Sequence, residues 1–86
     1  MATVEERVKA VTARVLGVDL AGIKLQDEFR ADLGAESIQS VELVANFEEE
    51  FGIEMDEDEA LSVETVGGAV EYIVKLCREQ GIEVET

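Results

Sequence analysis

A chain of 86 residues is long enough for one small domain, and its 47% hydrophobic residues provide a modest core. The net charge of −14, from 21 acidic and 7 basic residues, argues against binding to nucleic acid and favours partners with basic patches. Histidine is absent and cysteine occurs once, which excludes histidine-based catalysis and an intramolecular disulfide. We therefore expect one domain over residues 1–86, a cytoplasmic monomer that does not insert into membranes.

The first predicted helix follows Thr3, which forms a capping-box pattern with Glu6, and it ends at Gly17. Its apolar residues share one helical face: Val4, Val8, Val11 and Val15. Residues 17–35 then form a long connection that closes at Gly34. A connection of this length is unusual in a small domain and is often functional. Its apolar residues are expected to anchor it to the core: Val18, Leu20, Ile23, Leu25, Phe29 and Leu33.

Three further helices are predicted, over residues 37–51, 56–61 and about 65–79. Gly67 and Gly68 weaken the first turn of the last helix, and we expect the tail after Gly81 to be frayed. The pattern predicts an all-α fold: a small four-helix bundle of three main helices plus one short helix, with a long first loop.

The helix over residues 37–51 has two apolar faces when its residues are placed at about 100° per residue. The face with aromatic residues, namely Leu43, Phe47 and Phe51, is expected to enter the core. The opposite stripe consists of Ile38, Val41 and Ala45, flanked by Glu42, Glu48 and Glu49. An exposed apolar stripe with an acidic rim is typical of a transient docking surface. The alternative is that residues 17–35 fold over this stripe; we expect exposure.

The charges are distributed unevenly along the chain. No lysine or arginine occurs from Ala31 to Val74, whereas thirteen acidic residues do. Three of them, Glu48 to Glu50, lie at the C-terminal end of a predicted helix, where the helix dipole disfavours negative charge. This pattern favours a surface selected for binding. Solubility alone would explain the net charge but not the block without basic residues.

Ser37 begins the second helix, and its residue type allows two interpretations. A serine at a helix start is most often an N-cap, and residue chemistry alone favours that interpretation. A hydroxyl at this position is also well placed to hold a phosphate, because the helix N-terminus attracts anions. No catalytic triad can be built, so no catalytic residue is expected. Asp56–Glu59 lacks the glycine and glutamate that a calcium loop needs, so no dedicated metal site is expected; the alternative is loose binding of divalent cations by these clustered carboxylates. Cys77 lies on the apolar face of the last helix and is expected to be a buried, inert thiol.

Residues 29–44, FRADLGAESIQSVELV, followed by EEEFG at 48–52, resemble the acyl carrier protein family. The pairs Thr65-Val66 and Tyr72-Ile73 fit the family pattern, as do residues 5–8 and 16–18, so the resemblance covers nearly the whole chain. It implies that a phosphopantetheinyl transferase attaches phosphopantetheine from coenzyme A to Ser37, and that the chain carries acyl groups without catalysing a reaction. It also implies that the acyl chain can enter the bundle interior.

The resemblance further implies docking through the second helix to acyl-loading, synthase and acyltransferase enzymes with basic patches. The expected docking residues are Glu36, Ile38, Val41, Glu42, Ala45, Glu48 and Glu49. Three positions depart from the family pattern. Glu36-Ser37-Ile38 replaces the usual Asp-Ser-Leu, Asp56 replaces a common proline, and Met55 replaces a branched aliphatic residue. These departures indicate a specialised carrier for one pathway in fatty-acid, polyketide or related lipid synthesis. The alternative function is an unmodified acidic helical interaction module.

Overall fold

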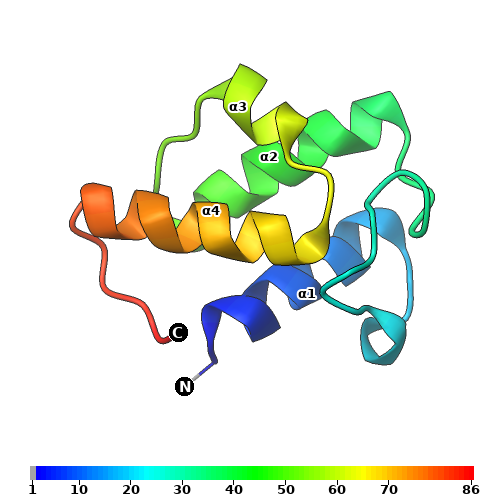
Figure 1. Ribbon diagram of the computed structural model, residues 1–86, viewed down its shortest axis with the longest axis horizontal. Helices are drawn as coiled ribbons and strands as arrows, with labels where there is room; N and C mark the ends of the chain where they lie inside the picture. Colours follow the sequence, from blue (N-terminus) through cyan, green and yellow to red (C-terminus); the bar gives the residue numbers. More distant parts are fainter. Residues whose placement is uncertain (1) are drawn as a thin grey trace.

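The computed structural model describes residues 2–86, which fold as four α-helices with no β-strand among them. The helices are α1 (Val4–Leu16), α2 (Ser37–Phe51), α3 (Glu57–Ser62) and α4 (Val66–Glu79). A single 3-10 turn, η1 (Leu20–Gly22), lies in the long connection between α1 and α2. Figure 1 shows the short α3 leading from the end of α2 back to the start of α4. The predicted all-α fold, with three main helices and one short helix, is confirmed.

The ends of α1 follow the predicted signals. The Thr3 hydroxyl accepts a hydrogen bond from the Glu6 N–H at 3.2 Å, and the Glu6 carboxylate accepts one from the Thr3 N–H at 2.8 Å. Gly17 ends the helix in the left-handed region with φ 68°, and Gly52 ends α2 in the same way with φ 65°. Only glycine adopts this conformation without strain, so these two residues fix where the helices stop.

The three long helices share a hydrophobic core. The aromatic-bearing face of α2 is buried as predicted, with Leu43, Phe47 and Phe51 each 4% exposed. The most deeply buried side chains come from the other two helices: Val4, Val8, Val11, Val66, Ile73 and Cys77. Thr12 is also buried, and its hydroxyl donates to the Val8 carbonyl at 2.8 Å, so this polar group is satisfied. The core therefore rests mainly on branched aliphatic residues.

The long connection is anchored by fewer side chains than expected. Ile23 and Phe29 are buried, but Leu20 and Leu25 are 50% and 40% exposed, so the prediction that these two leucines anchor the connection was wrong. Backbone hydrogen bonds hold this part of the chain instead. The Phe29 N–H donates to the Glu64 carbonyl at 2.9 Å, just before α4 begins.

Gly67 explains how the connection lies so close to α4. Its N–H donates to the Leu25 carbonyl at 2.8 Å, and a Cβ at this position would lie 3.1 Å from that carbonyl oxygen. The glycine that weakens the first turn of α4 is therefore needed for close contact with the connection. Residues 24–29 are thereby fixed against the start of α4.

The C-terminal tail is ordered against α1, so the prediction that it is frayed was wrong. The Val4 N–H donates to the Glu85 carbonyl at 2.7 Å, and the Ile82 N–H donates to the Cys77 carbonyl at 2.8 Å. Ile82 and Val84 pack half-buried against the core, which the charged residues between them concealed in the sequence. Figure 1 shows the two ends of the chain close together.

Arg7 compensates part of the negative charge at the end of α2. Its guanidinium donates to the Glu50 carboxylate at 2.9 Å and to the Glu50 carbonyl at 2.8 Å, and it lies 4.3 Å from the centre of the Phe51 ring. A cation bound to a helix C-terminal carbonyl is favourable because the helix dipole is negative there. One of the three glutamates at this helix end, Glu50, is therefore paired.

Candidate functional site

Ser37 is the first helical residue of α2 and is exposed. Glu36, not Ser37, is the N-cap residue, so the N-cap interpretation of Ser37 was wrong. The Gln39 side chain accepts from the Glu36 N–H at 3.0 Å, a contact that fixes the start of the helix without Ser37. None of the side-chain hydrogen bonds among residues 2–86 involves the Ser37 hydroxyl. The hydroxyl is therefore accessible and has no structural task in this part of the chain.

The start of α2 fits a phosphate attached to Ser37. The first turn of a helix leaves backbone N–H groups without helical partners, and these groups and the helix dipole favour an anion. The helical residues of the first turn of α2 include no acidic side chain, but the carboxylate of the N-cap residue Glu36 accepts from the Gln39 N–H. A phosphate on Ser37 would therefore use the N–H groups of Ser37 and Ile38. Ser40, one turn further on, keeps its hydroxyl bonded to the Glu36 carbonyl at 3.3 Å.

The apolar stripe of α2 is exposed, as predicted. Ile38 is 71% exposed and Val41 is 46% exposed, and Ala45 is exposed as well. The alternative, that residues 17–35 cover this stripe, is therefore wrong. A single exposed apolar side chain is normal on a protein surface, whereas several that share one helix face are typical of an interaction site.

The acidic residues beside the stripe fall into two groups. Glu36, Glu42 and Glu49 are exposed. Glu48 is half-buried, and its carboxylate accepts from the Met55 N–H at 2.9 Å, so it also fixes the chain between α2 and α3. The structure thus brings the predicted docking residues to one helix but gives Glu48 a structural contact in addition.

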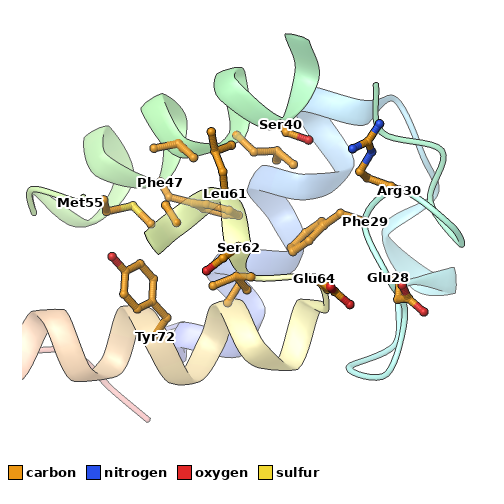
Figure 2. A pocket seen from close by; sticks show the side chains of 15 residues that line it. Glu28, Phe29, Arg30, Ser40, Phe47, Met55, Leu61, Ser62, Glu64 and Tyr72 are labelled. Carbon is orange, nitrogen blue, oxygen red and sulfur yellow. The ribbon is translucent and has the colours of Figure 1, made fainter. Parts of the chain in front are cut away.

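A cavity of about 420 Å³ lies between α2, α3 and the start of α4, and we call it the α2–α3 cavity. Its wall is largely apolar, with Phe29, Leu43, Phe47, Leu61, Val63 and Ala69 among its lining residues. Figure 2 shows Arg30 and Ser40 at one end of the cavity and Met55 and Tyr72 at the other. The volume lies in the range of small-molecule pockets, roughly 300–1,000 Å³. The sequence indicated an interior able to admit an acyl chain only through the resemblance, and it did not identify these lining residues.

Tyr72 connects α4 to α3 beside the cavity. Its hydroxyl lies 3.3 Å from a carboxylate oxygen of Glu59, to which it donates a hydrogen bond. Partial burial, and then the negative charge of Glu59, raise the pKa of Tyr72 above its ordinary value. The short helix α3 is thereby tied across the cavity by a single side-chain hydrogen bond to α4 among residues 2–86.

We also looked for a reactive thiol, a metal cluster and a membrane-spanning helix in residues 2–86. Cys77 is fully buried as predicted, and burial raises the pKa of its thiol, which disfavours the reactive thiolate. Residues 2–86 contain no cluster of three or more side chains suited to hold a metal ion. None of the helices in this range is both long and apolar enough to cross a membrane.

Comparisons with known proteins match most of the chain to one family. A family model described as "Phosphopantetheine attachment site" matches residues 6–73. The chain is 48% identical over 75 residues to the acyl carrier protein of Sinorhizobium fredii and to acyl carrier protein AcpP of Rhizobium meliloti, covering 87% of this chain and 96% of each relative. Its structure is similar to that of the acyl carrier protein from Enterococcus faecalis, with TM-score 0.69 and 35% identity, over 87% of this chain and 99% of that one.

Proposed function

This chain belongs to the acyl carrier protein family, and we propose that it carries acyl groups as thioesters on a phosphopantetheine arm attached to Ser37. The observation that supports Ser37 most is its position. It is exposed, it begins α2, and its hydroxyl is free of the hydrogen bonds that fix the helix start. Ser40 and Ser62 donate to the carbonyls of Glu36 and Glu59, at 3.3 and 2.7 Å respectively.

The residues around Ser37 fit such an arm. The arm supplies a terminal thiol that holds the acyl group, and the N–H groups at the start of α2 favour the phosphate at its root. The apolar lining of the α2–α3 cavity supports its use as shelter for an acyl chain, because burial of each methylene is worth about 0.8 kcal/mol. The protein contributes position and shelter, and its partner enzymes contribute the chemistry.

Members of this family serve synthase and transferase enzymes. For this chain the proposal names a phosphopantetheinyl transferase and acyl-loading, synthase and acyltransferase enzymes, which bind as basic-faced partners to α2. The proposed contact residues are Glu36, Ile38, Val41, Glu42, Ala45, Glu48 and Glu49. Exposed apolar residues supply burial and the carboxylates steer the approach of a positive surface. The proposal treats residues 1–86 as one monomeric carrier domain and places it in the cytoplasm, where coenzyme A is available.

The proposal includes specialisation for one pathway. Glu36 is one methylene longer than the aspartate usual in the family, and Ile38 has a stiffer side chain than the usual leucine. Because Ile38 is 71% exposed, its shape reaches any enzyme that approaches Ser37. Replacing both, Glu36→Asp with Ile38→Leu, should improve loading by general fatty-acid enzymes and weaken use by a dedicated partner. Equal loading rates for both forms with all partners would refute specialisation at these positions.

Intact-mass measurement after incubation with coenzyme A and a phosphopantetheinyl transferase tests the assignment of Ser37. The wild type should gain the mass of one phosphopantetheine, and peptide mapping should locate it on Ser37. Ser37→Ala should gain none. Ser40→Ala, a matched change one turn along the same helix, should be modified like the wild type. A wild type without the added mass would favour the unmodified interaction module, and modification of Ser37→Ala would place the arm elsewhere.

A further inference from the structure

We propose that Arg30 binds the phosphate of the arm and so directs the arm toward the α2–α3 cavity, an inference that rests on the proposed attachment to Ser37. Arg30 is exposed, and it lines the cavity together with Ser40. Figure 2 shows their side chains at the same end of the cavity. It is also the last basic residue before the block from Ala31 to Val74 that contains none.

The backbone around Arg30 is held in place next to α2. The preceding residue, Phe29, is buried, its N–H donates to the Glu64 carbonyl, and its carbonyl accepts from the Ala35 N–H at 2.8 Å. Ala35 is two residues before Ser37. This short closed loop keeps Arg30 beside the start of α2, so an ion pair with a group on Ser37 would need little ordering of the backbone.

The guanidinium of Arg30 has no ion pair among residues 2–86, whose two salt bridges are made by Arg7 and Lys9. Arg30 makes no ion pair although two carboxylates, those of Glu28 and Glu64, line the same cavity. In a protein of net charge −14, a phosphate meets general repulsion, and a free arginine close by offsets it. Arginine also matches phosphate geometry with two parallel N–H donors, which lysine does not.

The position of Ser40 shows how Arg30 lies relative to Ser37. Residues three apart on a helix are neighbours on its surface, so Ser37 and Ser40 lie on adjacent positions of one face. Because Ser40 lines the cavity end where Arg30 lies, a phosphate on Ser37 falls near that end rather than near Tyr72. The phosphate is therefore the oxygen-rich group best placed for Arg30, since the acyl group is attached at the far end of the arm.

Nuclear magnetic resonance of the loaded protein tests this role. The phosphorus resonance of the arm and the Nε–H resonance of Arg30 are followed in the form with a free thiol, which carries the phosphate but no acyl group. We expect the Arg30 Nε–H signal to shift between unloaded and loaded wild type. We expect the phosphorus signal to shift in loaded Arg30→Gln and to shift less in Arg30→Lys. Lys24→Gln, which removes an exposed cation of the same connection that does not line the cavity, should leave the phosphorus signal unchanged.

The wild-type measurement keeps the test independent of how well a variant is loaded. An Arg30 Nε–H signal that is the same with and without the arm would overturn the inference while leaving attachment to Ser37 intact. A shift that appears only after acylation would assign Arg30 to the acyl group and would also overturn it. A wild type that gains no arm mass would instead overturn the proposed function, together with this inference.

Discussion

The two sides of the bundle differ in how closely they are packed. Where α1 meets α4, Val8 and Ile73 are completely buried, and the ordered tail adds further cover. Where α3 covers α2, Met55 and Tyr72 are only half-buried around a cavity of about 420 Å³. The first side has the close packing that stabilises a small domain, and the second leaves space for a ligand. The proposed function thus assigns stability to one side of this 86-residue chain and the carriage of acyl groups to the other.

The largest expected effect contrasts the two sides directly. Ile73→Ala should reduce the free energy of unfolding by about 2–5 kcal/mol, because it leaves a void in close-packed surroundings. Leu61→Ala removes a similar side chain from the cavity wall, where it is 42% exposed, and should cost less than about 1 kcal/mol. Urea unfolding measures both. Should Ile73→Ala not fold, Ile73→Val is expected to cost about 0.5–1.5 kcal/mol. Equal costs at the two positions would contradict the contrast.

A smaller effect concerns the charges. Arg7→Gln should reduce the free energy of unfolding by about 1–2 kcal/mol, because it removes the bonds to Glu50 and the contact with the Phe51 ring. Lys75→Gln, at an exposed site on α4 before its last turn, is the matched control and should change stability by less than about 0.5 kcal/mol. If both variants lose the same stability, the effect is one of net charge and not of these contacts.

The helix starts give the next contrast. Thr65 is the N-cap of α4 and accepts from the Gly68 N–H at 3.0 Å, so Thr65→Ala should cost about 1 kcal/mol. Ser37→Ala should cost less than about 0.5 kcal/mol, because Glu36 occupies the N-cap position of α2. Thermal unfolding of the unloaded forms compares the two. A loss at Ser37 as large as that at Thr65 would show that the serine stabilises the helix start after all.

The smallest expected effect is a pH dependence. The pKa of Tyr72 is raised above its ordinary value of 10.0, so the hydroxyl ionises more readily in the unfolded chain than in the folded one. Its contribution is therefore complete at neutral pH and is lost as pH rises above about 10. Tyr72→Phe should make stability fall less steeply in that range. Cys77, whose pKa burial also raises, remains in both forms and accounts for part of the loss. Identical alkaline slopes would show that folding does not raise the pKa of Tyr72.

The sequence predicted the helices well because their end signals are local. Thr3, Gly17, Gly52 and Thr65 each act within one turn, so their meaning does not depend on the rest of the fold. The exposed stripe of α2 was predictable for the same reason, since its period is a property of one helix. The proposed attachment residue was identified through resemblance, since residue chemistry alone favoured an N-cap.

What the sequence did not predict depends on contacts between distant segments. Leu20 and Leu25 look like Ile23 in the sequence, and only the docking of the connection onto α4 determines which of them is buried. The order of the tail depends on the backbone bond between Val4 and Glu85. The α2–α3 cavity is formed by several elements at once, and Arg30 acquires a place at its edge only when the connection folds beside α2.

The account's central claim is that the acyl chain lies in the α2–α3 cavity. The most direct test is to locate the acyl chain in the loaded protein. Nuclear Overhauser effects between a medium-length saturated acyl chain and the protein would report this position. Contacts with the rings of Phe47 and Tyr72, which line the cavity, are expected, and contacts with Val8 and Val11 on the α1 side are not. An acyl chain that contacts Val8 and Val11, or that contacts no side chain of the bundle, would contradict the account.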